Sequence, residues 1–177
     1  MGRIVAVEYL SLDGVFENPA WTQPYFDAGV AAFQAAAMGW ADALLLGRVT
    51  YDGMSVAWPQ IGNDPGTGGD IMNSIRKYVP TSTLTEPTWN ATFLKGDVVE
   101  EVTKLKAGDE NVVIYGSGRL TETLRAAGLI DEYRLLVGPV VLGEGRKLFT
   151  DAVPTTFTLT ESRTSASGVL LLTLAVA

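Results

Sequence analysis

The sequence predicts an α/β fold with a mainly parallel sheet, helices on both faces and a C-terminal antiparallel hairpin. Between residues 4 and 137, short apolar runs typical of buried strands alternate with segments of helical periodicity. After residue 155, two strand-like segments follow each other across a Ser-Ala-Ser-Gly turn. The alternation predicts parallel strands joined by helical crossovers, and the direct succession predicts a hairpin.

The chain is expected to begin with an apolar strand over residues 4–10. Residues 11–24 are expected to form a long loop, because one glycine and two prolines interrupt any regular structure there. A loop of this length inside a compact domain is often functional. Gly39 is expected to end the helix that follows. Its inward face is predicted to consist of four residues at helical spacing, namely Phe26, Val30, Phe33 and Ala37.

A second run of alternating elements is expected over the middle of the chain. A short apolar strand is predicted at residues 43–46, followed by a helix near residues 49–54. A further helix is predicted at residues 70–76, and it leads into strands at residues 77–81 and 92–94.

Asp97 and Glu100 have the spacing of a capping pair at the start of another helix. The inner face of that helix is predicted to be Val98, Val102 and Leu105. The remaining predicted elements are a strand at 112–115, a helix marked by Leu120, Leu124 and Ala127 and ended by Gly128, a strand at 133–137, and hairpin strands at 156–162 and 169–177.

Length and composition favour one domain over residues 1–177, since the chain is 47% hydrophobic and shows no linker. The formal net charge is −7, so a nucleic acid is not an expected partner. No apolar run approaches the roughly 18 residues that span a bilayer, and the N-terminus lacks the pattern of a signal peptide. We therefore expect a soluble cytoplasmic protein without membrane contact.

The chain contains no cysteine and no histidine. This composition excludes thiolate nucleophiles, Ser-His-Asp catalysis and the usual zinc ligands, so no metal site is expected. Any proton chemistry must use a carboxylate, lysine, tyrosine or water.

Two predicted strand-to-helix turns combine glycine with arginine, at Gly47-Arg48 and at residues 116–119. A helix N-terminus attracts phosphate, glycine lets the phosphate approach the backbone, and arginine adds a cationic donor. Two such turns at one sheet edge are suited to a pyrophosphate or a 2′-phosphate. Alternatively, each glycine only permits a tight turn; Thr121 stands where the dinucleotide-binding fingerprint has its third glycine.

Several segments occur in the order found in a known family. They are Ser11-Leu12-Asp13-Gly14, Leu45 to Tyr51, Gly116-Ser117-Gly118, Gly128 to Tyr133, Pro139 to Gly143, and Leu148-Phe149. The chain resembles stand-alone relatives of the reductase domain of bacterial riboflavin deaminase-reductases and, more distantly, dihydrofolate reductase. The resemblance covers nearly the whole chain and implies a dihydrofolate-reductase-like fold, NADPH as the usual cofactor, and often a homodimer.

The resemblance also implies which residues bind the cofactor. Residues matching its phosphate-binding motif are Gly47, Arg48 and Thr50, those matching its pyrophosphate turn are Gly116, Ser117, Gly118, Arg119 and Leu120, and those matching its ribose-contacting strand end are Thr81 and Ser82. Many relatives carry arginine at the position of Ser82, so NADH is not excluded. Arg48 is an alternative contact for the 2′-phosphate.

On the substrate side, the resemblance makes Asp27 the nearest counterpart of the helix carboxylate that grips the pterin ring in dihydrofolate reductase. Acting near neutral pH would require a raised pKa, which burial under Trp21 would provide. The alternative is a helix-start aspartate favoured by the helix dipole. Asp13 is expected to shape the pocket. The aromatic residues Trp21, Tyr51 and Trp58 either stack on a flat substrate or belong to the core or the pocket wall.

The leading hypothesis is an NADPH-dependent reductase that transfers hydride to a small flat pterin- or pyrimidine-like substrate, with Asp27 or water as the proton source. One alternative is a non-catalytic nucleotide-binding or structural homodimer of the same fold, and another is a flavin-binding protein. A bifunctional deaminase is excluded because the zinc ligands are missing. The dimer interface is expected in the late strands and residues 138–149, because the apolar stretch 135–142 is expected near a sheet edge.

Overall fold

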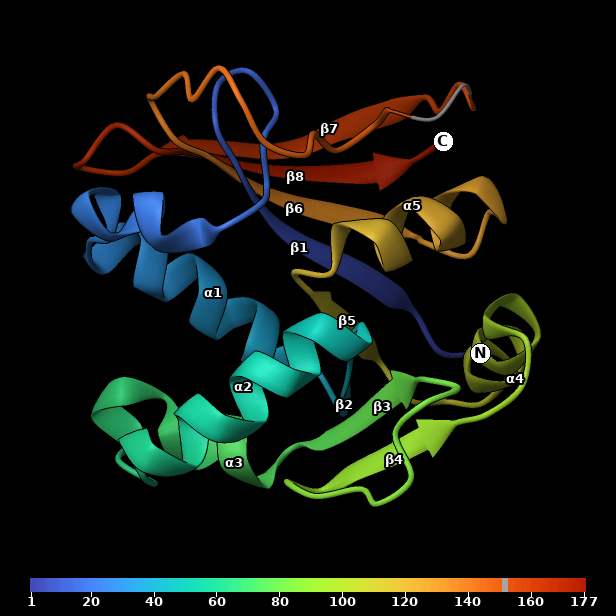
Figure 1. Cartoon of the computed structure of the whole chain (residues 1–177). Helices are drawn as coiled ribbons and strands as arrows, with labels where there is room; N and C mark the ends of the chain where they lie inside the picture. The colour runs from blue at the N-terminus through green and yellow to red at the C-terminus, as the bar shows by residue number, and fades with distance from the viewer. Residues whose placement is uncertain (151–152) are drawn as a thin grey trace.

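A computed structural model describes residues 1–150 and 153–177 of the chain. Within these residues, eight strands form one sheet in the order β4-β3-β2-β5-β1-β6-β8-β7 (Figure 1). The strands are β1 (Ile4–Leu10), β2 (Ala43–Leu45), β3 (Arg76–Pro80), β4 (Ala91–Leu94), β5 (Val112–Tyr115), β6 (Glu132–Val137), β7 (Phe157–Thr164) and β8 (Leu170–Val176). β1 to β6 pair in parallel, and β8 runs antiparallel between β6 and β7.

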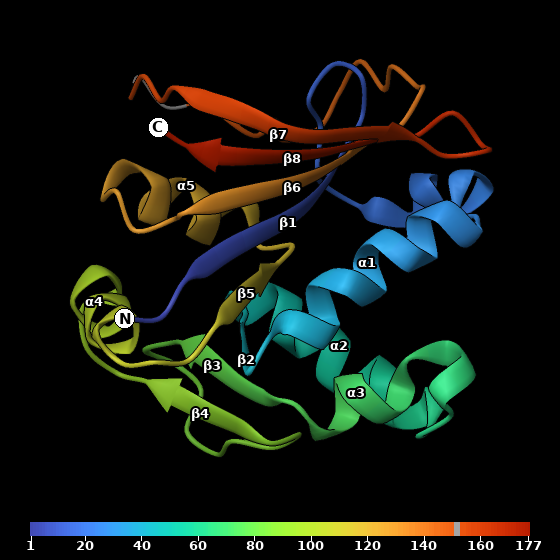
Figure 2. The ribbon, with the colours of Figure 1, turned by 180° about the vertical axis from the view of Figure 1, so that it is seen from behind.

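Helices cover both faces of this sheet. The helices are α1 (Ala28–Trp40), α2 (Arg48–Ile61), α3 (Gly69–Ser74), α4 (Val98–Ala107) and α5 (Gly118–Ala126), with 3-10 turns η1 (Pro19–Tyr25) and η2 (Pro65–Thr67). α1, α2 and α3 lie on one face and α4 and α5 on the other, which Figures 1 and 2 show from opposite sides.

The side chains of β1, in the middle of the sheet, are buried on both faces. Val5 and Val7 face the apolar cluster under α1 and α2, and Ile4 and Ala6 face the cluster under α4 and α5. Both sets of side chains are buried, as expected for a parallel strand that is covered on each face. The predicted fold class is therefore confirmed, including the C-terminal hairpin.

The predicted capping at Asp97 is also found. Its carboxylate accepts hydrogen bonds from the backbone N–H groups of Val99 and Glu100, at 2.9 and 3.1 Å. These bonds satisfy two N–H groups that the first turn of α4 leaves without helical partners.

The ends of four helices differ from the predictions. α3 ends at Ser74, and Arg76 already belongs to β3. Phe26 is not on the inner face of α1; it precedes the Asp27 cap and is 55% exposed, and the helix continues past Gly39 to Trp40. α2 extends beyond residue 54 to Ile61 and contains Pro59 in its last turn. Ala127 is exposed and follows the end of α5.

The apolar stretch at residues 135–142 does not lie at a sheet edge. β6 is an interior strand, because β8 pairs with it on the side away from β1. Leu135 and Leu136 are buried, so core packing explains most of this stretch, whereas Val141 remains 65% exposed. In the described part of the chain, no helix has the length and apolar character needed to cross a membrane.

Candidate functional site: a cationic cavity and a hydrophobic recess

The sheet has a switch point between β1 and β5. From β1 the chain crosses through α1 to β2, whereas from β5 it crosses through α5, on the opposite face, to β6. In open α/β sheets, ligands bind outside the carboxyl ends of strands at such a point. The candidate site lies at this edge.

Ser117 joins the two predicted strand-to-helix turns. Its hydroxyl accepts a hydrogen bond from the Gly47 N–H at 2.8 Å and donates to the Thr50 hydroxyl at 2.9 Å. Gly116 and Ser117 both have left-handed backbone conformations, with φ of +61° and +69°. A Cβ on Gly47 would lie 3.3 Å from the Ser117 side chain, so the absence of a side chain permits this close approach.

Beside these turns lies a cavity of about 340 Å³ that has two cationic side chains. It is lined by Arg48, Pro80, Thr81, Ser82, Thr83, Lys95, Gly96 and Val98. We call this cavity the cradle. The structure thus brings together Arg48, Thr81 and Ser82, three of the residues that the resemblance assigns to cofactor binding.

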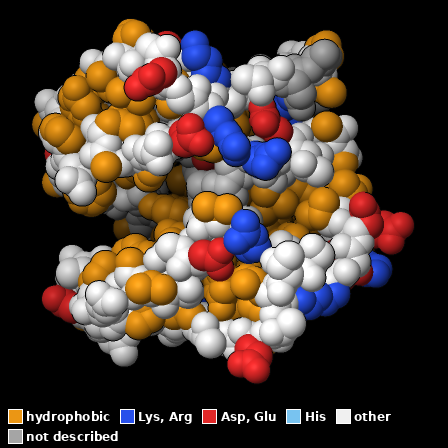
Figure 3. Space-filling model, in the orientation of Figure 1, with side chains coloured by type: hydrophobic (Ala, Val, Ile, Leu, Met, Phe, Trp, Pro, Cys, Tyr) orange, Lys and Arg blue, Asp and Glu red, His pale blue; other side chains and the backbone are white. Residues whose placement is uncertain are grey.

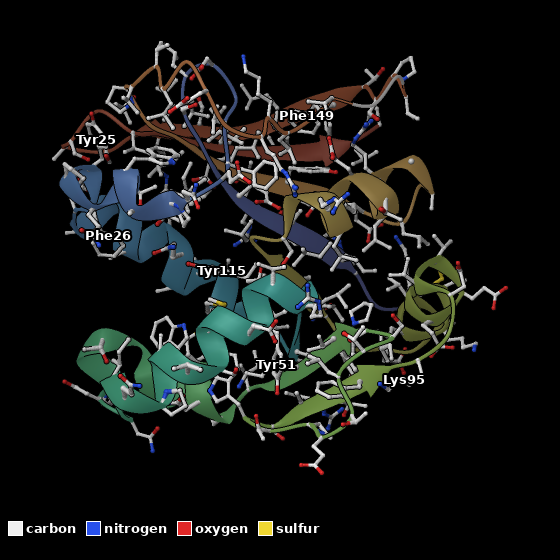
Figure 4. The ribbon with its side chains drawn as sticks, in the orientation of Figure 1. Tyr25, Phe26, Tyr51, Lys95, Tyr115 and Phe149 are labelled. Atoms are coloured by element: carbon white, nitrogen blue, oxygen red, sulfur yellow. The ribbon has the colours of Figure 1, made fainter. Side chains whose placement is uncertain are left out.

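Lys95 is a cradle residue that the sequence analysis missed. It directly follows β4 (Figure 4), and β4 pairs in parallel with β3, which Thr81 directly follows. The ammonium group of Lys95 donates to the backbone carbonyl of Leu84 and lies 5.4 Å from the centre of the Phe93 ring. The one sequence feature that could have indicated Lys95 as a site residue is its position directly after a predicted strand.

The start of α5 is covered by an aromatic ring. A Cβ added to Gly118 would lie 2.4 Å from Cζ of Phe16, so the ring sits directly over this backbone. Arg119 is exposed, whereas the Leu120 side chain packs into the core under α5. Leu120 therefore has only its backbone to offer at this helix end.

Asp27 caps α1 and holds the hairpin. Its carboxylate accepts hydrogen bonds from the backbone N–H groups of Val30 at 2.9 Å and Ser167 at 2.7 Å. These two bonds lower the pKa of Asp27 below its ordinary value. The raised pKa expected for a proton donor is thus not found, and the geometry matches the alternative of a helix-start aspartate.

Asp13 fastens two loops together. It accepts hydrogen bonds from the Ser11 hydroxyl at 2.7 Å and from the backbone N–H groups of Leu142 and Gly143 at 3.1 and 3.0 Å. The bonds from Ser11 and Leu142 are the main reason that the pKa of Asp13 falls to about 2. Asp13 therefore stays ionised and orders the loop that contains Phe16.

The three aromatic residues expected near a substrate have different surroundings. Tyr51 is buried, packs edge-on against Phe93 and accepts a hydrogen bond from the Thr88 N–H at 3.1 Å. Trp58 packs against the core under α2. Trp21 lines a second cavity, of about 430 Å³, between the loop after β1 and residues 142–145.

A polar cluster that the sequence analysis did not single out lies where β1 and β5 end. The Gln34 side-chain amide, from α1, donates a hydrogen bond to the Tyr115 hydroxyl. Burial raises the pKa of Tyr115 to about 12, and burial with the nearby Tyr115 raises that of Tyr9. Figure 4 places Tyr115 between α1 and α2, where Figure 3 shows a hollow with hydrophobic side chains around it. We call this hollow the recess.

Comparison with known protein families identifies the family of this chain. The family model described as the RibD C-terminal domain matches residues 3–171. The chain belongs to this family. A curated relative, the uncharacterized protein YyaP of Bacillus subtilis (strain 168), is 33% identical over 177 residues, covering 95% of this chain and 92% of its own length.

Solved structures with the same fold include reductase-like proteins. A putative riboflavin biosynthesis protein from Shewanella sp. PV-4 has a TM-score of 0.75 at 21% identity, covering 99% of both chains. A pyrimidine reductase-like protein from Corynebacterium diphtheriae has a TM-score of 0.69 at 14% identity, covering 99% of this chain and 92% of its own.

A diaminohydroxyphosphoribosylaminopyrimidine deaminase/5-amino-6-(5-phosphoribosylamino)uracil reductase from Thermotoga maritima also has a TM-score of 0.69, at 15% identity. The alignment covers 99% of this RibD C-terminal domain chain and 57% of that protein. These similarities show the dihydrofolate-reductase-like fold, and the RibD C-terminal family points to a reductase-type oxidoreductase.

Proposed function

We propose that this protein is an NADPH-dependent reductase that transfers hydride to a small flat conjugated substrate of the pterin or pyrimidine type. The observation that carries the proposal is the hydroxyl of Ser117, which joins two glycine-containing helix starts beside a cavity with two cations. This arrangement suits a ligand that carries several phosphates a short distance apart.

The residues fit a phosphorylated dinucleotide along its length. Arg48, Lys95 and the hydroxyl groups of residues 81–83 would hold the adenosine 2′-phosphate in the cradle. Backbone N–H groups and hydroxyls of the two turns would hold the pyrophosphate, from Gly47, Thr50, Gly116, Ser117 and Gly118. The bound cofactor would supply the hydride, and its reactive end would extend toward the recess.

Two cations in one cavity favour NADPH over NADH. Many relatives place arginine at the position of Ser82, and in this chain Lys95 supplies a cation to the same cavity. Arg48 pairs with Asp52 at 2.9 Å, and their side chains are 48% and 42% exposed. An exposed ion pair of this kind contributes little, so Arg48 can exchange Asp52 for a phosphate at small cost.

Water is the proton source in this proposal. Asp27 accepts two backbone hydrogen bonds that lower its pKa, so it stays ionised near neutral pH. Tyr115 keeps its proton because burial raises its pKa to about 12. The site residues would therefore bind and orient the reactants rather than exchange protons with them.

We also propose that the protein is a homodimer. Val141 and Leu159 are 65% and 55% exposed, and both lie in the region of the late strands and residues 138–149. β7 is the edge strand next to β8, and the bulge between Leu159 and Glu161 disfavours simple edge pairing. Contact through exposed apolar side chains is the mode that fits these features.

Oxidation of NADPH, followed at 340 nm with dihydrofolate and a panel of flat heterocycles, tests the catalytic proposal. We expect turnover with at least one substrate and loss of most of it in Arg48→Ala. The exposed Arg163→Ala, on β7, serves as the matched control. Failure across a broad panel, with NADPH still bound, would instead favour a non-catalytic nucleotide-binding protein.

A further inference from the structure

We propose that Gln34 orients the Tyr115 hydroxyl as a hydrogen-bond donor into the recess, where Gln34, Tyr9 and Tyr115 select an uncharged ligand with a carbonyl or imine acceptor. The identification of this ligand as the substrate rests on the proposed function. The selection itself rests on the geometry of the recess.

The three side chains come together because of the strand pairing. Val7 of β1 lies beside Tyr115 of β5, and Tyr9 follows two residues later, on the same face of the sheet as Val7. α1 crosses this face, and its Gln34 side chain reaches the Tyr115 hydroxyl. All three residues are partly buried at the switch point between β1 and β5.

The hydrogen bond from Gln34 leaves the Tyr115 hydroxyl free to act as a donor. An amide NH₂ group can only donate hydrogen bonds, so Gln34 donates and the Tyr115 oxygen accepts. The proton of Tyr115 is left to be donated elsewhere. Within residues 1–150 and 153–177, no acceptor for it lies within hydrogen-bonding distance. A half-buried phenol normally finds such an acceptor, and the recess is the open side from which a ligand would supply it.

The recess is electrically neutral at these groups. Gln34 carries no charge, and Tyr9 and Tyr115 keep their protons near neutral pH because burial is the largest cause that raises the pKa of both. A charged ligand would lose its hydration here without gaining an opposite charge. A neutral carbonyl or imine loses less and gains the Tyr115 hydrogen bond.

Selection of a neutral ligand differs from what the resemblance to dihydrofolate reductase suggests for α1. A carboxylate on α1 would favour a cationic ring, but Asp27 precedes α1 and is engaged as its N-terminal cap. Gln34, an amide, is the α1 side chain that contacts the strand ends. An amide offers a donor and an acceptor without charge, so it cannot form an ion pair with a cation.

The same hydrogen bond suits the proposed reduction. When a hydride adds to the carbon of a C=O or C=N group, the π electron pair moves to the heteroatom, which then takes a proton from water. A hydroxyl that donates a hydrogen bond to that heteroatom stabilises the developing negative charge and keeps its own proton. Tyr115 would be such a donor, and Gln34 would position it.

Three planar probes of nearly equal shape test the selection: benzamide is neutral, benzamidinium is cationic and benzoate is anionic. Their binding is measured by saturation-transfer NMR, with and without saturating NADPH. We expect benzamide to bind roughly ten-fold more tightly than either ion, because the ions are desolvated without a partner. We also expect this preference to persist with NADPH, which separates the recess from the position of the nicotinamide.

Two variants connect the preference to the named residues. Gln34→Glu is expected to reverse it toward benzamidinium, and Tyr115→Phe is expected to weaken benzamide by roughly ten-fold. Gln60→Glu, exposed on α2, and Tyr133→Phe, buried on the opposite face, are the matched controls and should change neither. Circular dichroism confirms that each variant is folded.

The proposal is overturned if no probe binds the wild type, or if Gln34→Glu and Tyr115→Phe leave the ratio of benzamide to benzamidinium binding unchanged. The proposed function fails separately. If NADPH does not bind while the charge preference and its reversal are observed, the recess selects neutral ligands in a protein that is not an NADPH reductase.

Discussion

The ring of Phe16 packs directly on the backbone of Gly118, where a methyl group would lie only 2.4 Å from its Cζ atom. This contact connects the long loop after β1 to the first residue of α5. Asp13 fixes the same loop to residues 142 and 143. The start of α5, which we propose as part of the pyrophosphate site, is therefore packed against the loop after β1.

Gly118→Ala is expected to destabilise the protein by about 1–3 kcal/mol, because the added methyl overlaps the Phe16 ring. The cost should largely disappear in a Phe16→Ala background, where the ring is gone. Urea unfolding of the two single variants and the double variant measures this coupling. Additive effects of the two substitutions would show that Phe16 does not occupy this position.

Ser117→Ala is expected to lower the free energy of unfolding by about 1–2 kcal/mol. The substitution leaves the N–H of Gly47 and the hydroxyl of Thr50 without their shared partner. Denaturant titration measures the loss, and Ser162→Ala, exposed on β7, is the control. We expect NADPH binding to weaken as well, and unchanged stability and binding would contradict the role given to Ser117.

Glu8 predicts how stability changes with pH. This side chain is 1% exposed, and burial is the main cause that raises its pKa from 4.5 to about 8, despite the hydrogen bond from Thr121. Between these two pH values the unfolded chain ionises while the native state stays protonated. Its stabilising contribution is therefore complete below pH 4.5 and is lost as pH rises toward 8, by at most about 1.4 kcal/mol per pH unit.

Glu8→Gln keeps a hydrogen-bonding group for Thr121 and removes the ionisation. We expect the variant to lose this part of the pH dependence and to exceed the wild type in stability at pH 8. Unfolding curves at pH 5, 6.5 and 8 provide the comparison, with the exposed Glu100→Gln as control. Parallel pH profiles for wild type and Glu8→Gln would show that Glu8 is not protonated in the native state.

The proposed dimer predicts a mass of two chains by light scattering at micromolar concentration. Combining Val141→Asp with Leu159→Glu should produce a monomer, because charges would be buried in an apolar contact. Val56→Asp, on α2 and 61% exposed, is the control and should remain dimeric. A monomeric wild type would rule out the homodimer.

The fold was predictable because apolar runs and helical spacing depend on nearby residues. The strand at 112–115 and the cap at Asp97 are examples, and glycine with arginine marked both turns of the candidate site. Lys95 and Gln34 could not be found in this way. Lys95 reaches the cradle only because β4 pairs with β3, and Gln34 reaches Tyr115 only through the way α1 packs over β5.

Asp27 shows the opposite case, in which a resemblance suggested chemistry that local structure does not favour. An aspartate directly before a helix satisfies backbone N–H groups, and this use lowers the pKa that catalysis would need raised. The apolar stretch at residues 135–142 is similar, because the insertion of β8 beside β6 turned an expected edge into core.

Calorimetric titration with NADPH and NADH tests the central claim most directly, using wild type, Arg48→Ala, Lys95→Ala and the exposed control Lys104→Ala. We expect micromolar NADPH binding by the wild type and weaker binding of NADH. Each cradle variant should weaken NADPH by roughly ten-fold or more, the cost of a lost charged hydrogen bond, and leave NADH nearly unchanged. Equal affinity of the wild type for both nucleotides, or unchanged NADPH affinity in both cradle variants, would contradict the account.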